Sequence, residues 1–586
     1  MTNDTSSQNR QPTSLHDQRD GGPVATEKAT QVTTVDTAPR RTVSVSDILR
    51  RSGAVFAQPF AELPPARRGR WPRVALGIVA LMAAAFTVFF TAYSSAKFDA
   101  YLTNAEDMGI MDQALWNTVH GSLLHQTICN SISDANCLGN VSRFSIHFEP
   151  LMLPLALLYL IAASPKALML VQALVVASGA FPAYWIANRR LGSPLAGICI
   201  AGMYLTFPAL QSAVLFDFHA VTLASAFLLF ALYFMLTRNN VGLFIAVILA
   251  MATKEEVPLD VVMIGLAVIV YQRRWRVGAV LVVLACAWLG TAELVMHIVS
   301  PLGHSPTAGR YAYLGSSPLQ AGLYVLTHPL QLLREQIIGN GGARYVQRLL
   351  TPDAYLAILA PMVWILAGPA LLINLLSSDP NMHMGIHQYS AEIVPFFVFS
   401  AIATVGLLVA ATEAIERSDP FLRLKRLLKG MLHGLLGGTF TLWLKVSAHL
   451  RIARIVMLAL VLLIAAFSIR QQHRLNTLPG SPNFHWPVVT AHAEIANTLI
   501  KRIPATASVS AQDALVPHLS HRHFIYQYPY AAYDADYVFL DTQTYVIYPF
   551  VDKDDYTASV QKLLASGQFT VVAQEDGYLL LKRIGR

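Results

Sequence analysis

Long apolar runs, separated by short polar breaks, repeat between Val74 and Ser468. A bilayer core of about 30 Å is crossed by about 20 apolar residues in a helix, and several of these runs reach that length. A soluble core rarely needs so many runs of this kind. The sequence therefore predicts an all-α multi-pass membrane bundle with about 10–12 membrane segments, counted at this length per crossing.

Charge is scarce and unevenly placed. Of the 586 residues 54% are hydrophobic and 13% are charged, against about 25% charged in soluble proteins. The net charge of +8 comes from basic residues at the ends of apolar runs, such as the cluster at 67–73. This placement is typical of cytoplasmic loops in membrane proteins. It argues against nucleic acid as a partner and for location in the cell membrane.

The enrichment of Lys and Arg in cytoplasmic loops, which we call the charge rule, also predicts the domain organisation. Residues 1–66 are polar and lack apolar periodicity, which predicts a disordered cytoplasmic tail. A transmembrane domain follows at 67–470, with a large first external loop at 97–149. A small α/β domain at 482–586 is expected on the extracytoplasmic side.

Several segments have a finer prediction. Helical spacing over 107–120 predicts an amphipathic helix at the membrane interface. Residues 151–163 are short for a full span, and Gly368-Pro369 interrupts 354–377, so the number of crossings at both segments stays open. Residues 277–299 lead into a long external loop that contains Arg310.

The last hundred residues carry strand and helix signals. Short β-rich stretches at 507–510 and 537–540 predict strands, and 556–566 predicts a helix. Two further stretches at 570–572 and 578–581 flank a turn and predict a closing hairpin. Whether this domain covers a binding site or only packs upon itself stays open.

Polar side chains gather at the ends of apolar runs that the charge rule places outside. An ionisable group within a membrane costs about 2.5–3.5 kcal/mol at mid-span and is therefore usually functional or paired. Each cluster alone is explained by a helix end at the headgroup level. Together the five clusters predict a wet, charged cavity at the outer boundary. They are Glu106 with Asp107, His147 with Glu149, Asp217 with His219, Lys254 with Glu255 and Glu256, and His387 with Tyr389.

Metal and disulfide chemistry have weaker signals. Asp217 and His219 offer two metal ligands, but the spacing supplies no third, so a divalent metal is not assigned. Cys129 and Cys137 lie close together in the first external loop and form a disulfide if that loop faces an oxidising compartment. The sequence has no phosphate-binding glycine loop, nucleophile elbow or zinc-binding helix motif.

From about residue 95 onward the chain resembles a bacterial family of multi-pass membrane proteins classified as a domain of unknown function. The resemblance follows the order of the motifs as well as their residues. The matching segments lie at 107–117, 145–150, 216–219, 253–257, 310–315, 374–381, 387–390, 503–510 and 536–538.

That family is similar in layout to the GT-C class of membrane glycosyltransferases, which take sugar from a polyprenyl-phosphate donor. The resemblance implies that an acidic residue of the first external loop is the catalytic base, in an inverting reaction. Asp107 fits this role, and Glu106 is the alternative. Lys254, Arg310 or His387 would then hold the donor phosphate.

The other clustered side chains are expected to bind substrate as well. They are His147, Glu149, Asp217, His219, Glu255 and Tyr389. Two other functions remain open. A lipid or small-molecule transporter or flippase would favour inverted repeats, which the sequence does not show. A non-catalytic scaffold or sensor would need none of the clusters. The sugar, the acceptor and the oligomeric state are not fixed by the sequence.

Overall fold

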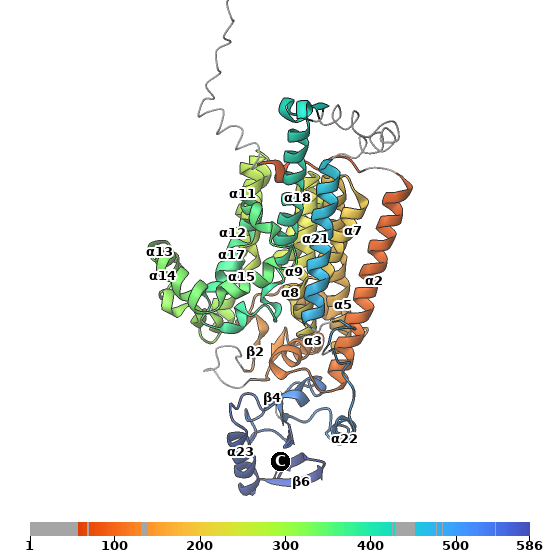
Figure 1. Cartoon of the computed structure of the whole chain (residues 1–586). Helices are drawn as coiled ribbons and strands as arrows, with labels where there is room; N and C mark the ends of the chain where they lie inside the picture. The colour runs from red at the N-terminus through yellow and green to blue at the C-terminus, as the bar shows by residue number, and fades with distance from the viewer. Residues whose placement is uncertain are drawn as a thin grey trace, which may run out of the picture. The chain divides into compact units, whose positions relative to one another are not determined.

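The computed structural model describes residues 57–66, 69–129, 139–424, 426–427, 452–475, 478–482, 484–544 and 546–585. This part of the chain is mostly helical, with a small sheet near its C-terminal end. Figure 1 shows the long helices α2, α18 and α21 and the shorter helix α7 running alongside one another.

Five helical segments among the described residues are long and apolar enough to cross a membrane. A sixth arises if α7 and α8, which bend by 44°, form one broken span. The five are α2 (Arg70–Asp99), Pro165–Leu191 with α5 (Pro165–Ser178) and α6 (Ala180–Leu191), α12 (Trp275–Val299), Gln388–Glu416 with α18 (Val394–Glu416), and Ile452–Arg474 within α21 (Ile452–Leu475). The bent pair is α7 (Pro194–Leu205) with α8 (Pro208–Leu215).

The prediction of about 10–12 membrane segments exceeds these full-length candidates. The difference arises because the sequence-based count included shorter apolar helices as if each were a full span. These are α9 (Ala220–Leu236), α10 (Asn240–Met251), α11 (Val257–Val270) and the segment Pro361–Leu376. The last is broken as predicted, into α16 (Pro361–Trp364), η7 (Ile365–Ala367) and α17 (Gly368–Leu376).

Local sequence explains where these helices begin and how closely they pack. Ser164 and Ser193 accept backbone hydrogen bonds at the first turns of α5 and α7, and a proline follows each. Gly179, between α5 and α6, allows close contact, because a Cβ there would lie 2.3 Å from the Tyr204 hydroxyl oxygen. That hydroxyl donates to the Val176 carbonyl at 2.8 Å and so joins α7 to α5.

Shorter elements connect the long helices at the end nearer the sheet. The first connection holds η2 (Ala105–Gly109), α3 (Ile110–Val119), β1 (His125–Gln126), β2 (Val141–Ser142), η3 (Arg143–Ser145) and α4 (Met152–Tyr159). The later ones hold η4 (Pro306–Leu314), α13 (Pro318–Thr327), α14 (Pro329–Leu332), η5 (Leu333–Gly339), α15 (Gly342–Leu350), η6 (Leu356–Leu359), η8 (Pro380–His383) and η9 (Gln388–Ser390).

The helix predicted over 107–120 forms, but not at a surface. It begins as the π-helical turn η2 and continues as α3, whose residues Ile110 to Leu115 are all buried. The polar members are buried because they contact α4 and the α/β domain predicted at 482–586, which we call the C-terminal unit. Asp112 accepts hydrogen bonds from the hydroxyls of Tyr159 and Ser520, and Gln113 donates to the Arg522 carbonyl.

The predicted tail ends earlier than residue 66. Residues 1–56 lie outside the described part, but η1 (Gln58–Phe60) packs against the helices. Phe60 is fully buried and stacks on Tyr271 with ring centroids 4.4 Å apart. Arg189 and Arg190 donate to backbone carbonyls along this segment. One buried aromatic ring and satisfied carbonyls order a segment whose composition alone suggested disorder.

The C-terminal unit confirms the predicted strands, helix and hairpin. Its strand order is β4-β3-β5-β7-β6, with β3 parallel to β4 and β5, and β7 antiparallel to β5 and β6. The sequence did not predict α22 or β4. The elements are α22 (Ala491–Ile500), β3 (Val509–Ala511), η10 (Asp513–His518), β4 (Ile525–Gln527), β5 (Tyr537–Asp541), α23 (Lys553–Ala565), β6 (Phe569–Glu575) and β7 (Tyr578–Arg583).

His492 makes the stability of this unit depend on pH. Its two ring nitrogens lie 2.9 Å from Asp576 and 3.1 Å from Asp541, and both donate only when the ring is charged. Burial opposes that charge, but the hydrogen bonds of the two carboxylates outweigh it and raise the pKa of His492. The stabilisation is therefore complete below the unfolded pKa of about 6.5 and is lost as pH rises through the raised pKa.

We expect the wild type to unfold at a higher temperature than His492→Gln at pH ~6, and the difference to shrink at higher pH. Thermal unfolding of both proteins, from pH ~6 upward through the raised pKa of His492, measures the difference in unfolding temperature. A difference in unfolding temperature that stays constant with pH would contradict the stabilisation by a charged His492 between Asp541 and Asp576.

Candidate functional site

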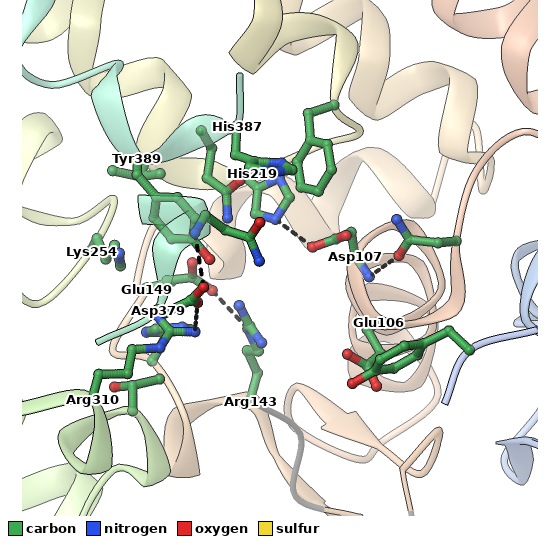
Figure 2. Close-up of a pocket in the computed structure, with 18 of the residues that line it drawn as sticks. Glu106, Asp107, Arg143, Glu149, His219, Lys254, Arg310, Asp379, His387 and Tyr389 are labelled. Carbon is green, nitrogen blue, oxygen red and sulfur yellow. Dashed lines mark hydrogen bonds and ion pairs between the residues drawn. The ribbon is translucent and has the colours of Figure 1, made fainter. Parts of the chain in front are cut away.

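A polar cavity of about 350 Å³ lies where the helices meet the C-terminal unit. Nine of the eleven side chains that the sequence assigned to a site line it (Figure 2). They are Glu106, Asp107, His147, Glu149, His219, Lys254, Arg310, His387 and Tyr389. The structure thus brings together residues spread over nearly 300 positions, while their roles remain predictions.

The turn η2 presents Glu106 and Asp107 to the cavity. Asn104 precedes the turn, and its side-chain oxygen accepts a hydrogen bond from the backbone N–H of Asp107 at 2.8 Å. The backbone N–H of Ala105 donates to Asp513 of the C-terminal unit at 3.1 Å. The turn is therefore fixed from both sides, which orients its two carboxylates.

His219 holds the Asp107 carboxylate. Its Nε2 lies 3.0 Å from Asp107 Oδ1, and only a protonated nitrogen can donate to that oxygen. The backbone N–H of His219 donates to Gln172 of α5 at 2.9 Å, and Gln172 in turn donates to the Asp217 carbonyl. This chain of contacts sets the position of the imidazole relative to the turn.

The charge state of Asp107 follows from its neighbours. Burial alone would raise its pKa, but the hydrogen bond and charge of His219, the hydrogen bond of Asn104 and the charge of Lys97 outweigh it. The pKa of Asp107 therefore lies below its ordinary value. Asp107 is ionised at neutral pH, so it can accept a proton.

Positive charge is concentrated on the other side of the cavity. Figure 2 shows Lys254 and Arg310 opposite Glu106 and Asp107, with Arg143 between the two groups. Lys254 and Arg310 both lie over the ring of Tyr389, at 5.5 and 5.8 Å from its centroid.

Each of these three cations has a carboxylate partner. Lys254 pairs with Glu256 at 2.5 Å, Arg143 with Glu149 at 3.0 Å, and Arg310 with Asp379 at 3.5 Å. The pairing keeps the cations in place, and the longer contact of Arg310 is the loosest of the three.

Two predicted site residues lie behind the wall instead of in it. Asp217 is buried, accepts from Lys97 at 3.0 Å and from the Asn104 backbone, and so supports the η2 turn. Glu255 accepts from His147 at 2.7 Å and from the Phe148 backbone at 3.0 Å. Burial is the main reason that the pKa values of both carboxylates are raised. Both are better described as positioning residues than as substrate contacts.

Three polar atoms at the cavity are buried without a hydrogen-bond partner among the described residues. They are Nδ1 of His219, Nδ1 of His387 and Oε1 of Gln388. Buried polar groups are usually satisfied, so these atoms are available to hydrogen-bond with a polar molecule in the cavity. The rings of His219 and His387 both contact Phe216.

Sequence reasoning missed other members of the lining. The missed residues are Asn104, Arg143, Phe216, Val221, Thr307, Asp379, Asn381, Gln388, Asp513 and Tyr548. Arg143 and Asp379 could have been found, since each is a charged residue close to a predicted cluster. Asp513 and Tyr548 had no such signal, because only the tertiary fold brings the C-terminal unit to the cavity.

The remaining sequence-based questions concern a disulfide and a metal ion. Cys129 is disulfide-bonded, while its predicted partner Cys137 lies outside the described residues. Across the described ranges, no group of three or more His, Cys, Asp or Glu side chains is arranged to hold a metal ion.

Comparison with known proteins identifies the family. The family described as "Predicted membrane protein (DUF2079)" matches residues 97–580, which is most of the chain, so the protein belongs to it. The match begins near the end of α2 and includes the cavity and nearly all of the C-terminal unit. No curated protein matches the chain.

Proposed function

We propose that this member of the family is an inverting membrane glycosyltransferase of GT-C-like architecture. It moves a sugar from a polyprenyl-phosphate donor to an acceptor hydroxyl, and Asp107 is the general base. The observation that carries the proposal is the Asp107 carboxylate, held by His219 across the cavity from Lys254 and Arg310.

The reaction uses the two sides of the cavity differently. Asp107 takes the proton of the acceptor hydroxyl as that oxygen forms a bond to the anomeric carbon. The bond from this carbon to the phosphate oxygen breaks on the opposite face, which inverts the configuration. Charge then develops on the departing polyprenyl phosphate, and Lys254 and Arg310 stabilise it.

Arg310 is the cation best suited to bind the phosphate directly. Its guanidinium presents a planar fork that matches phosphate oxygens, and its contact with Asp379 is the longest among the three pairs. Lys254 is buried close to Glu256, so it acts as a fixed positive charge behind the leaving group.

The orientation in the membrane follows from the charge rule. We place the N-terminus in the cytoplasm and the cavity and C-terminal unit on the extracytoplasmic side of the cell membrane. Arg189, Arg190, Arg273 and Arg274 lie at helix ends on the cytoplasmic side in this arrangement. A lipid-linked donor would then reach the cavity from the outer leaflet.

Transfer of labelled sugar tests the proposal. Membranes that contain the full chain are supplied with polyprenyl-phosphate sugars, and label in acceptor products is compared with membranes that lack the chain. Transfer that depends on the chain supports the proposal. If no transfer depends on the chain over a broad panel of donors and acceptors, the transporter function would be favoured instead.

Asp513 is expected to act through the η2 turn. It is buried, accepts from the backbone of Ala105 and from Gln527 at 2.8 Å, and burial is the main cause that raises its pKa to about 7. Asp513→Ala removes this anchor, and misplacing a catalytic group by about 1 Å can cost about 100-fold in rate.

We therefore expect Asp513→Ala to lower transfer by about 10- to 100-fold through kcat. Asp513→Asn keeps an acceptor oxygen and should retain more activity. Steady-state kinetics of both variants measure this. Equal activity of Asp513→Ala and the wild type would exclude a positioning role.

A proton-coupled transporter is a second candidate, because of two carboxylates inside the helical part. Asp260 of α11 and Glu392, next to α18, are each 1% exposed, and both have carboxylate oxygens that are buried without a hydrogen-bond partner among the described residues. Such groups within a membrane are usually functional. Asp260→Asn and Glu392→Gln should leave sugar transfer intact if the chain is a transferase. Loss of proton-driven uptake in these variants would favour transport.

A further inference from the structure

The long loop predicted after α12 contains a helical arm with an exposed apolar face. We call residues 318–339 the leucine arm; it comprises α13, α14 and η5. Leu319, Leu326 and Leu330 are 74–79% exposed. Leu323, Leu333 and Ile338 are exposed as well. Such a run of large exposed apolar side chains marks an interaction surface.

The opposite face of the arm is already covered. Ala321, Tyr324 and Val325 of α13 pack with a small core formed by Leu314, Leu332 and Leu376. The arm therefore carries large apolar side chains on both faces, and only one of these faces is buried within the protein. Arg334 and Glu335 are its only charged residues, and both lie in η5.

Neighbouring elements indicate what covers the exposed face. The arm packs through Leu332 on Leu376 of α17, a short apolar helix that itself exposes Leu372. Helix α12 precedes the arm in the chain. Only 22% of its most apolar 18-residue stretch is buried within the protein. Figure 1 shows α13 and α14 at the outer edge of the helical part, level with α17 and away from the C-terminal sheet.

We infer that the leucine arm lies against the hydrocarbon of the membrane, so that this loop returns to the bilayer. The lipid phase is the natural occupant, since α12 is long and apolar enough to span the membrane and most of its apolar stretch is not buried within the protein. The arm follows η4, which carries Thr307 and Arg310 of the cavity, so its insertion would fix the cavity relative to the membrane.

Nitroxide accessibility tests the inference in the full chain within bilayers. Leu323→Cys and Leu330→Cys are labelled in a background in which the free Cys199 and Cys286 are serine. Val551→Cys is the matched control, because Val551 is an apolar residue of the C-terminal unit and is 98% exposed. Collisions with oxygen, which partitions into lipid, are compared with collisions with a water-soluble nickel chelate.

We expect the ratio of oxygen to nickel collisions to be several-fold higher at both arm positions than at position 551. Equal ratios at the arm and the control would show that the arm faces water and would overturn the inference. Spin–spin broadening at the arm that disappears on dilution with unlabelled protein would also overturn it, since a second copy would then cover the face.

Discussion

Asp107→Asn should lower sugar transfer by about 100- to 10,000-fold, the usual contribution of a general base. Asparagine has nearly the same shape and can still contact His219, but it cannot accept the acceptor's proton. The loss should therefore be in kcat, with the unfolding temperature close to that of the wild type. Initial rates over a range of donor concentrations measure the effect.

Glu106→Gln is the matched control for this prediction. Glu106 lies in the same turn and lines the same cavity, so its replacement perturbs the surroundings in a comparable way. We expect transfer to survive in this variant. If Asp107→Asn were fully active and Glu106→Gln inactive, the base would be Glu106. The protein would still be a glycosyltransferase.

Arg143→Met should be the most destabilising single change at the cavity. Arg143 and Glu149 are 3.0 Å apart, with side chains only 7% and 2% exposed, so removing the cation leaves a buried carboxylate without its partner. Breaking a buried ion pair in this way costs about 3–5 kcal/mol. The midpoint of thermal unfolding in detergent micelles measures the loss.

Two further variants separate the ion pair from general perturbation. Arg143→Met with Glu149→Met removes both charges and should recover much of the loss. Arg238 pairs with Glu62 at 2.9 Å, but both side chains are 54% exposed, so Arg238→Met should cost only about 0–1 kcal/mol. Equal losses at Arg143 and Arg238 would contradict the account.

The strands and the hairpin of the C-terminal unit were predictable because their signals are local. The segments at 537–540 and 578–581 combine β-branched, aromatic and leucine residues, and the structure pairs them as β5 and β7. Helix α22 and strand β4 were missed. Strand β4 has only three residues and owes its place to parallel pairing with β3, which no local pattern encodes.

The cavity was predictable in part for a different reason. Ionisable groups at the ends of apolar runs are costly, so each cluster was visible singly, and the charge rule placed all five on one side. Which members face the cavity was not visible. Asp217 and Glu255 appeared equivalent to Asp107 and His147, yet the structure uses them to hold those neighbours.

Segments whose order depends on tertiary contacts were predicted least well. The residues after position 56 look disordered by composition, but Phe60 enters a pocket formed by helices from far along the chain. The turn η2 is π-helical because Asp513 and Asn104 hold its backbone, and both contacts are invisible in a local pattern.

The reaction that we propose for the cavity breaks a sugar–phosphate bond and forms a glycosidic bond with inversion. The most direct measurement follows purified protein in bilayers with a polyprenyl-phosphate sugar and an acceptor, recording released polyprenyl phosphate and the configuration of the product. We expect one polyprenyl phosphate to be released per glycoside formed, and the anomeric configuration of the product to be opposite to that of the donor. Retention of configuration, or a donor that stays intact with every acceptor tried, would contradict it.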